Sequence, residues 1–256
     1  MNRRSFLLKN SAEYEKKSRK ARQAAVDRIL QMPATPWAVL IISLILTGVA
    51  WYIADRAVDR RIAERFEYQA ADIVSAISKR MREYEVVLRS SLGLFKASET
   101  VSREEWKIFT DNLHIEKYYP GIQGIGFSVM VPPEKKEAHE KTVRAEGFPD
   151  YGIKPDGERD MYSAIIYLEP FDWRNQRAFG YDMFSQETRR EAMERARDTG
   201  VAAMSGRVTL VQETKKDVQY GFLLYLPLYK KNKLVDTPQR RREALVGFVY
   251  SPFRVK

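Results

Sequence analysis

The residues best suited to chemistry lie in one irregular segment, residues 169–184 (EPFDWRNQRAFGYDMF), which mixes aromatic and charged side chains without a hydrophobic period. Long irregular stretches inside compact domains are often functional. Asp182 is its most informative carboxylate, because Tyr181, Met183 and Phe184 surround it with aromatic and apolar groups. Such a carboxylate can accept a hydrogen bond from the N–H group of a bound heterocycle. It can equally accept backbone N–H groups near the start of a following helix, and the pattern leaves both readings open.

Catalytic and metal-binding patterns are missing elsewhere. The two histidines, His114 and His139, each stand alone, so a metal site built on paired imidazoles has no support. The chain has no cysteine and contains neither a Gly-x-x-x-x-Gly-Lys nor a Gly-x-Ser-x-Gly motif. The sequence therefore predicts no catalytic residue, no metal site, no cofactor and no enzyme activity for this chain.

One uncharged apolar run indicates where these residues are placed in the cell. Residues 37–53 carry no charge, and Trp37, Trp51 and Tyr52 stand at the two ends, where aromatic rings prefer the headgroup region of a bilayer. A helix needs about 17–25 apolar residues to cross the hydrocarbon core. We therefore expect a transmembrane helix over residues 37–54, with the lipid bilayer as a partner.

The distribution of charge predicts the orientation of this helix. Residues 1–36 are strongly basic, whereas basic and acidic residues alternate directly after the span. The positive flank stays inside, so residues 1–36 are expected to be a cytoplasmic arm. The rest of the chain would lie outside, in the periplasm of a single-pass inner-membrane protein. The net charge of +10 is largely explained by this arm, and we expect no nucleic-acid partner.

Residues 55–96 have the pattern of a long stalk helix that continues the membrane helix. They contain no proline, and apolar or small residues recur at steps of mostly three and four. Near the membrane this stripe needs a cover, and pairing with a second copy of the chain is the simplest one. The stripe therefore predicts a parallel homodimer near the membrane, whereas its C-terminal half is expected to pack on the chain's own domain. It consists of Ile62, Phe66, Ala70, Ile73, Ile77, Met81, Tyr84, Leu88 and Phe95.

Residues 97–256 predict a mixed α+β domain with antiparallel sheets. Ser102 and Glu105 form a capping box, and Ser185 and Gly200 are expected to cap a later helix at its two ends. Helices are expected at 102–113, 134–146 and 185–199, and strands at 121–131, 163–168, 207–212, 219–229 and 245–250.

Several blocks in this region closely resemble the CHASE domain, the extracytoplasmic sensor of membrane histidine kinases and diguanylate cyclases. The blocks are 119–127 (YPGIQGIGF), 165–170 (IIYLEP), 175–184 (NQRAFGYDMF), 189–200 (RREAMERARDTG), 205–213 (SGRVTLVQE) and 247–254 (GFVYSPFR). The resemblance extends from about residue 69 to the C-terminus. It implies a stalk helix and two stacked PAS-like α/β lobes, with a ligand in the membrane-distal lobe.

The resemblance also implies a set of ligand-binding residues. Plant members of the family bind cytokinins, which are N6-substituted adenines, so a small, purine-like ligand is implied. Asp182 matches the aspartate that hydrogen-bonds the adenine, Thr214 matches a pocket threonine, and Met204 matches a position that contributes backbone contacts. Met204 is leucine in the plant receptors, so the shape of the pocket is expected to differ.

The family continues beyond the position of Pro252 into further sensor, a second span and an output domain, so we expect this chain to be C-terminally truncated. It is then interpreted as the ligand-sensing module of a membrane signalling receptor whose output domain lies elsewhere. The alternative is a membrane-tethered protein-interaction domain without a small-molecule pocket. A closed apolar cavity beside Asp182 would favour the first reading, and a filled core with an exposed apolar patch the second. The ligand, the output type and the sign of signalling are not encoded in these patterns.

Overall fold

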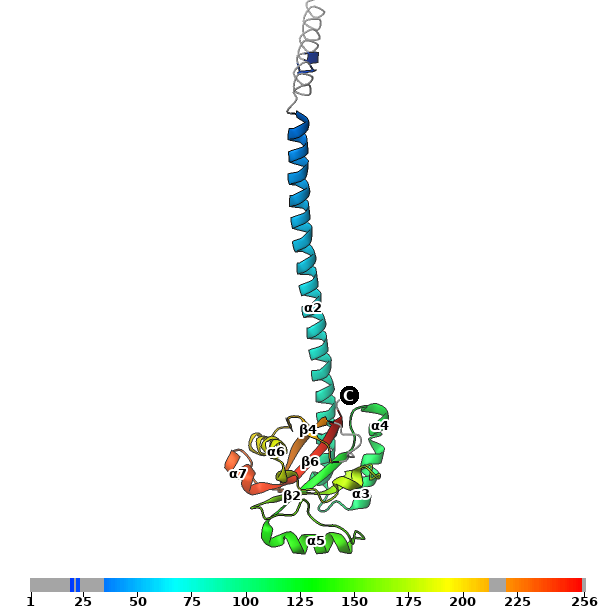
Figure 1. Ribbon diagram of the computed structural model, residues 1–256. Coiled ribbons are helices and arrows are strands. Elements are labelled where there is room, and N and C mark those ends of the chain that lie inside the picture. Colours follow the sequence, from blue (N-terminus) through cyan, green and yellow to red (C-terminus); the bar gives the residue numbers. More distant parts are fainter. Residues whose placement is uncertain (1–18, 21, 24–34, 212–219, 255–256) are drawn as a thin grey trace, which may run out of the picture. The chain divides into compact units, whose positions relative to one another are not determined.

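The computed structural model describes residues 19–20, 22–23, 35–211 and 220–254 (Figure 1). The chain divides into two units, residues 1–75 and residues 76–256.

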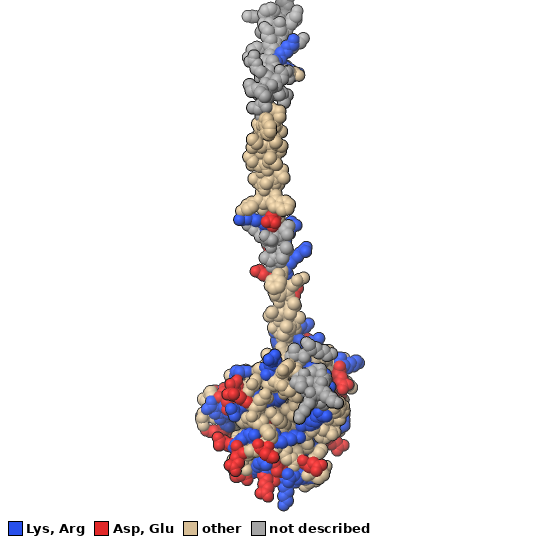
Figure 2. Space-filling model, viewed as in Figure 1, with Lys and Arg blue, Asp and Glu red and all other residues tan. Residues whose placement is uncertain are grey.

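Helix α2 runs without interruption over Thr35–Ala97. By length and composition, its segment Thr35–Arg56 is suited to crossing a membrane, and this segment includes the predicted span. The segment carries almost no charged side chains and is visible as the uncharged stretch in Figure 2. Residues 55–96, which the sequence assigns to a stalk helix, lie within α2.

The second unit is built on an antiparallel sheet in which the strands follow the order β2-β1-β6-β5-β3, with β4 also paired to β5. The strands are β1 (Ile125–Val131), β2 (Tyr162–Glu169), β3 (Ala203–Met204), β4 (Val208–Thr209), β5 (Tyr220–Tyr229) and β6 (Leu245–Arg254). The antiparallel pairing predicted for the last strands is confirmed by the long β5–β6 ladder. The described residues form this one sheet, because β1 pairs directly with β6. The two PAS-like lobes are therefore not seen in the described part of the chain.

Short helices connect the strands. They are α3 (Arg103–Asn112), α4 (Ile115–Tyr118), α5 (Lys136–Ala145), α6 (Glu187–Thr199) and α7 (Pro238–Ala244), with 3-10 turns η1 (Pro133–Lys135), η2 (Asn175–Ala178) and η3 (Met183–Ser185). The predicted capping box of α3 is present: the Ser102 side chain accepts the Glu105 N–H, and the Glu105 carboxylate accepts the Ser102 N–H at 2.8 Å. The strands β3 and β4 span only two residues each, too few to show an alternating pattern.

The expected N-cap of α6, Ser185, is wrong by one residue, because Gln186 stands at that position. Residues 183–185 form the turn η3, so α6 begins at Glu187 and Ser185 does not cap it. The Ser185 hydroxyl instead donates to the backbone oxygen of Asp182 at 2.6 Å. The predicted C-cap is confirmed, because Gly200 adopts a left-handed φ of 75° that suits glycine.

Two apolar clusters cover the two faces of the sheet. Along β5, Leu224, Leu226 and Leu228 point to one face, and Leu223 and Tyr225 to the other, as the two-residue period of a strand requires. The α2-side cluster consists of Tyr84, Val87, Leu88, Leu92, Val101, Trp106, Ile115, Ile122, Ile125, Phe127, Leu224, Leu226, Leu228, Val249 and Phe253. The α6-side cluster consists of Ile165, Leu168, Ala178, Met183, Phe184, Ala192, Met193, Ala196, Ala203, Val208, Leu210, Leu223, Tyr225, Phe248 and Tyr250.

Candidate functional site

Residues 180–182 are hydrogen-bonded through their backbone to β2 on one side and to the loop residue Lys154 on the other. The Gly180 N–H donates to the Ile165 oxygen at 3.0 Å, and the Asp182 N–H donates to the Lys154 oxygen at 2.7 Å. Gly180 has a φ of 79°, and a Cβ atom there would lie 2.3 Å from the Gly152 oxygen. Only glycine fits this turn, and the turn delivers Asp182 to the edge of β2.

The Asp182 carboxylate is fully buried, with 0 % of the residue exposed. Its Oδ1 atom accepts the Ser163 N–H at 2.8 Å and the Phe184 N–H at 3.0 Å. Its Oδ2 atom lies 3.4 Å from Arg159 Nε and accepts no hydrogen bond among the described residues. Burial raises the pKa of Asp182, against the lowering effect of the two N–H groups and of the nearby arginines.

The two readings of Asp182 therefore apply to different oxygens. Oδ1 accepts two backbone N–H groups, as expected if Asp182 stabilises the start of the following helical segment. Oδ2 retains acceptor capacity in a buried setting, where an unsatisfied polar atom costs about 1–3 kcal/mol. The carboxylate is thus both a fixed structural element and a group with one oxygen left for a further donor.

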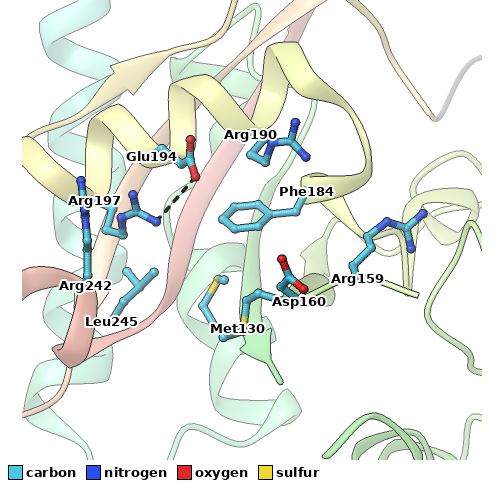
Figure 3. A pocket seen from close by; sticks show the side chains of 10 residues that line it. Met130, Arg159, Asp160, Phe184, Arg190, Glu194, Arg197, Arg242 and Leu245 are labelled. Carbon is cyan, nitrogen blue, oxygen red and sulfur yellow. Dashed lines mark ion pairs between the residues drawn. The ribbon is translucent and has the colours of Figure 1, made fainter. Parts of the chain in front are cut away.

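A pocket of about 430 Å³ opens next to this carboxylate (Figure 3). Its wall on α6 is formed by Arg190, Glu194 and Arg197, which lie at steps of four and three on one helix face. The remaining wall comes from β1, the loop before β2, η3, α7 and β6. It consists of Met130, Arg159, Asp160, Met161, Phe184, Arg242 and Leu245.

Asp182 does not line this pocket but holds two of the residues that do. Phe184 is fixed through its backbone N–H group, and Arg159 through the ion pair with Oδ2. A substitution of Asp182 would therefore alter the positions of Phe184 and Arg159 in the wall of the pocket. Conversely, if Arg159 moved, the Asp182 Oδ2 atom, which accepts no hydrogen bond among the described residues, would lose its ion-pair partner.

Two further polar groups lie inside the α6-side cluster. Tyr225 and Tyr250 are paired across β5 and β6, and their ring centroids are 6.3 Å apart. Neither hydroxyl has a hydrogen-bond partner among the described residues, and burial raises the pKa of both. These phenols can each donate one hydrogen bond and accept others.

The other residues expected at the site are not brought to this pocket. Met204 lies in β3, its side chain is half-exposed, and its backbone oxygen accepts a hydrogen bond from Arg195 at 2.6 Å. Thr214 lies outside the described residues. The sequence interpretation missed Arg159, Phe184 and Arg190 as wall residues. For Arg190, the one signal was its spacing from Glu194 and Arg197 within a predicted helix.

Neither histidine forms a metal site with the residues that the structure describes. His139 Nε2 lies 2.9 Å from the Tyr151 hydroxyl, and burial lowers the pKa of this histidine. In the described ranges 35–211 and 220–254, no group of three or more histidine, aspartate or glutamate side chains is arranged to hold a metal ion.

Comparison with known proteins gives two findings. A family model described as the CHASE domain matches residues 99–256. A hybrid signal transduction histidine kinase A from Dictyostelium discoideum is 21% identical over 250 aligned residues, covering 88% of this chain and 11% of that protein. The chain therefore spans only about a tenth of the length of this curated relative.

Proposed function

Because this chain belongs to the CHASE domain family, whose domains are extracytoplasmic sensors of signalling proteins, we propose that it is the ligand-sensing module of a membrane receptor. The matched region is a sensor domain rather than a catalytic one, and it covers residues 99–256. The output of the whole receptor is proposed to be a histidine kinase or a diguanylate cyclase. A histidine kinase has the support of the Dictyostelium relative's name.

The observation that carries the proposal is the position of Asp182. Its Oδ2 atom is buried and accepts no hydrogen bond in the described part of the chain, and both Arg159 and Phe184, which contact the carboxylate, line a 430 Å³ pocket. Pockets of about 300–1,000 Å³ hold small molecules. A ligand N–H group that reached Oδ2 in place of Arg159 would satisfy the carboxylate and shift Arg159 at the same time.

We propose the ligand to be a small molecule with an N–H donor, of purine-like type, bound on the α6 side of the sheet. Asp182 would accept its N–H group, with Thr214 and the backbone of Met204 as further contacts. The single sheet would then be one PAS-like lobe, the ligand-binding one of the two. The Met204 oxygen accepts a hydrogen bond from Arg195, so a ligand there would compete with this bond.

Ligand-induced stabilisation of the full chain in detergent micelles tests the proposal. A compound that binds only the folded state raises the melting temperature, and a panel of purines, amino acids and short peptides is to be compared. Asp182→Asn keeps an acceptor for Ser163 and Phe184 but replaces Oδ2 by an amide. A charge-assisted hydrogen bond contributes about 1.5–3 kcal/mol, so affinity should fall roughly 10- to 150-fold.

Glu140→Gln is the matched control. Glu140 is also buried and accepts a backbone N–H, that of Ile153 at 2.9 Å, but it lies away from the pocket residues. This variant should bind the compound as the parent does. Full affinity in Asp182→Asn would refute the anchoring role. Stabilisation by no compound would favour the alternative, a membrane-tethered protein-interaction domain.

The signal is proposed to pass through α2, with the N-terminus in the cytoplasm and residues beyond 55 in the periplasm. The charge asymmetry around the span of a single-pass inner-membrane protein supports this orientation. A ligand can shift α2 only through its different affinity for two states of the lobe. Reporter fusions after Lys96 should be active only outside the cytoplasm, and cytoplasmic activity would reverse the topology.

We further propose that α2 pairs with a second copy of the chain in parallel. Phe66, Ile73 and Ile77 are large apolar residues that α2 leaves exposed. Cysteines replacing Phe66 or Ile73 should crosslink between chains, and cysteines replacing Arg65 or Asp72 should do so poorly. Equal crosslinking at all four positions would mean that this stripe is not the seam of a dimer.

A further inference from the structure

The wall of the pocket beside Asp182 carries more positive than negative charge. Four arginines line it, at positions 159, 190, 197 and 242, against the two carboxylates of Asp160 and Glu194. Two of the arginines already form ion pairs: Arg197 and Arg242 both bind the carboxylate of Asp198, at 2.7 and 2.6 Å. These two hold α6 and α7 together at one end of the pocket.

The other two arginines lie around Phe184 at the opposite end (Figure 3). Arg159 donates to the backbone oxygens of Pro155 and Gly157 and pairs with the buried Asp182. The Arg190 guanidinium forms no ion pair or side-chain hydrogen bond with any residue that the structure describes. Arg190 is therefore a cationic donor on the pocket wall whose guanidinium N–H groups make no such bond with the described residues, although its charge helps to lower the pKa of Asp182.

The same pocket has an apolar floor. Phe184 is buried, and its ring lies between Arg190 and Met130 in the view of Figure 3. Met130, Met161 and Leu245 add further apolar surface. An apolar group that covers such a floor gains about 25 cal/mol per Å² removed from water. A guanidinium binds a carboxylate through two parallel N–H bonds, more strongly than it binds a neutral acceptor.

We infer that this pocket is a subsite for a small organic anion with an apolar body, such as an aryl carboxylate. The carboxylate lies against Arg190, the apolar body lies on Phe184, and Asp160 and Glu194 disfavour ligands of higher negative charge. The inference rests on the proposed sensor function and adds an anionic group and an apolar body to the chemistry proposed for its ligand. The anionic group binds at the outer wall, and Asp182 lies behind that wall.

Titration calorimetry on the full chain in detergent micelles tests the subsite with phenylacetate and its neutral isostere phenylacetamide, at one fixed ionic strength. Phenylacetate should bind at least about tenfold more tightly than the amide, because the amide loses the charge-assisted bonds. Arg190→Gln should weaken phenylacetate about tenfold and leave phenylacetamide unchanged. Arg190 is exposed and glutamine is a good helix former, so the variant should fold.

Arg240→Gln is the matched control, since it removes the same charge from α7 outside the pocket and breaks only an exposed ion pair with Asp236. It should bind phenylacetate as the parent does. Equal affinity for acid and amide, equal loss in both arginine variants, or no saturable binding at millimolar phenylacetate would each overturn the inference. If a panel compound still stabilises the chain through Asp182, the sensor proposal stands while the anion subsite fails.

Discussion

The two faces of the sheet bury similar sets of apolar residues but differ in the hydrogen bonding of their buried polar atoms. On the α2 side, the Tyr84 hydroxyl donates to the Pro120 oxygen at 2.9 Å, and the Tyr167 hydroxyl donates to the Val101 oxygen at 2.7 Å. On the α6 side, the hydroxyls of Tyr225 and Tyr250 have no hydrogen-bond partner in the described part of the chain, and Asp182 Oδ2 is in contact only with Arg159, through an ion pair at 3.4 Å. Trp106 Nε1 is an exception on the α2 side.

The difference lies in how completely the buried polar atoms of each face are hydrogen-bonded. A polar atom buried without a partner costs about 1–3 kcal/mol, so each such atom in a native structure calls for an explanation. The α2 side joins the C-terminal turns of α2 to the sheet through Leu88 and Leu92. The α6 side buries polar side-chain atoms that accept or donate no hydrogen bond among the described residues, which is the feature on which the proposed ligand site rests.

The largest effects should come from cavities made on the two faces. Leu88 and Met193 are both fully buried, one in each cluster. Truncation of either to alanine costs about 2–5 kcal/mol. Leu88→Ala should lie at the upper end because its cavity is apolar and stays dry. Met193→Ala should lie lower because its cluster contains polar groups that water can bind. Urea unfolding in detergent micelles measures both, and equal costs would weaken the contrast between the faces.

Removing one hydroxyl from each face should give effects of different sign. Tyr84→Phe deletes a made hydrogen bond and leaves the Pro120 oxygen without its donor, which should cost about 1 kcal/mol. Tyr250→Phe deletes a buried hydroxyl that has no hydrogen-bond partner among the described residues, so stability should stay level or rise. Thermal melting of both variants measures the two effects. Destabilisation by Tyr250→Phe equal to that of Tyr84→Phe would mean that the Tyr250 hydroxyl forms a hydrogen bond.

The pH dependence of stability should also differ between two buried carboxylates. Burial raises the pKa of Asp182, so the folded state binds its proton more tightly than the unfolded state. Its contribution is full below the unfolded pKa of about 3.9 and is lost as pH rises through the folded pKa. The stability of the parent relative to Asp182→Asn should therefore fall as pH rises above about 4.

Glu140 should behave in the opposite way. Burial alone would raise its pKa, but Lys136, the Ile153 N–H and Arg144 together lower it. Its contribution is present above the unfolded pKa of about 4.3 and is lost as pH falls through the folded pKa. The stability of the parent relative to Glu140→Gln should therefore rise with pH over this acidic range. Denaturant titrations at a series of pH values measure the stability difference between the parent and each variant. If both differences changed with pH in the same direction, the opposite pKa shifts assigned to Asp182 and Glu140 would be contradicted.

Local signals in the sequence predicted much of this fold. The capping box at Ser102 and the left-handed cap at Gly200 depend on neighbours within one turn of helix. The strand β5 was readable because its apolar residues continue over ten positions. The start of α6 was misplaced because Asp182, rather than Ser185, accepts the N–H group that organises the preceding turn.

The candidate site could be predicted only in part, because its contacts are made between distant segments. Asp182 stood out by its aromatic neighbours, yet its partners Arg159 and Ser163 come from the strand β2 and the loop before it. Arg190, Glu194 and Arg197 lie at steps of four and three in α6 and so share one helix face. Only the packing of α6 on the sheet shows that this face lines a pocket. The blocks that resemble the CHASE domain, in contrast, were sufficient to identify the family.

The smallest effects should come from exposed charges on the helices of either face. Lys107 and Asp111 form an exposed ion pair on α3, and Arg190 is exposed on α6. Exposed pairs contribute little because water and salt screen them. Asp111→Asn and Arg190→Gln should both melt at the temperature of the parent without ligand. Only Arg190→Gln should lose stabilisation by phenylacetate, since only this residue lines the pocket. A similar loss in Asp111→Asn would show that general charge, rather than the α6-side pocket, attracts the anion.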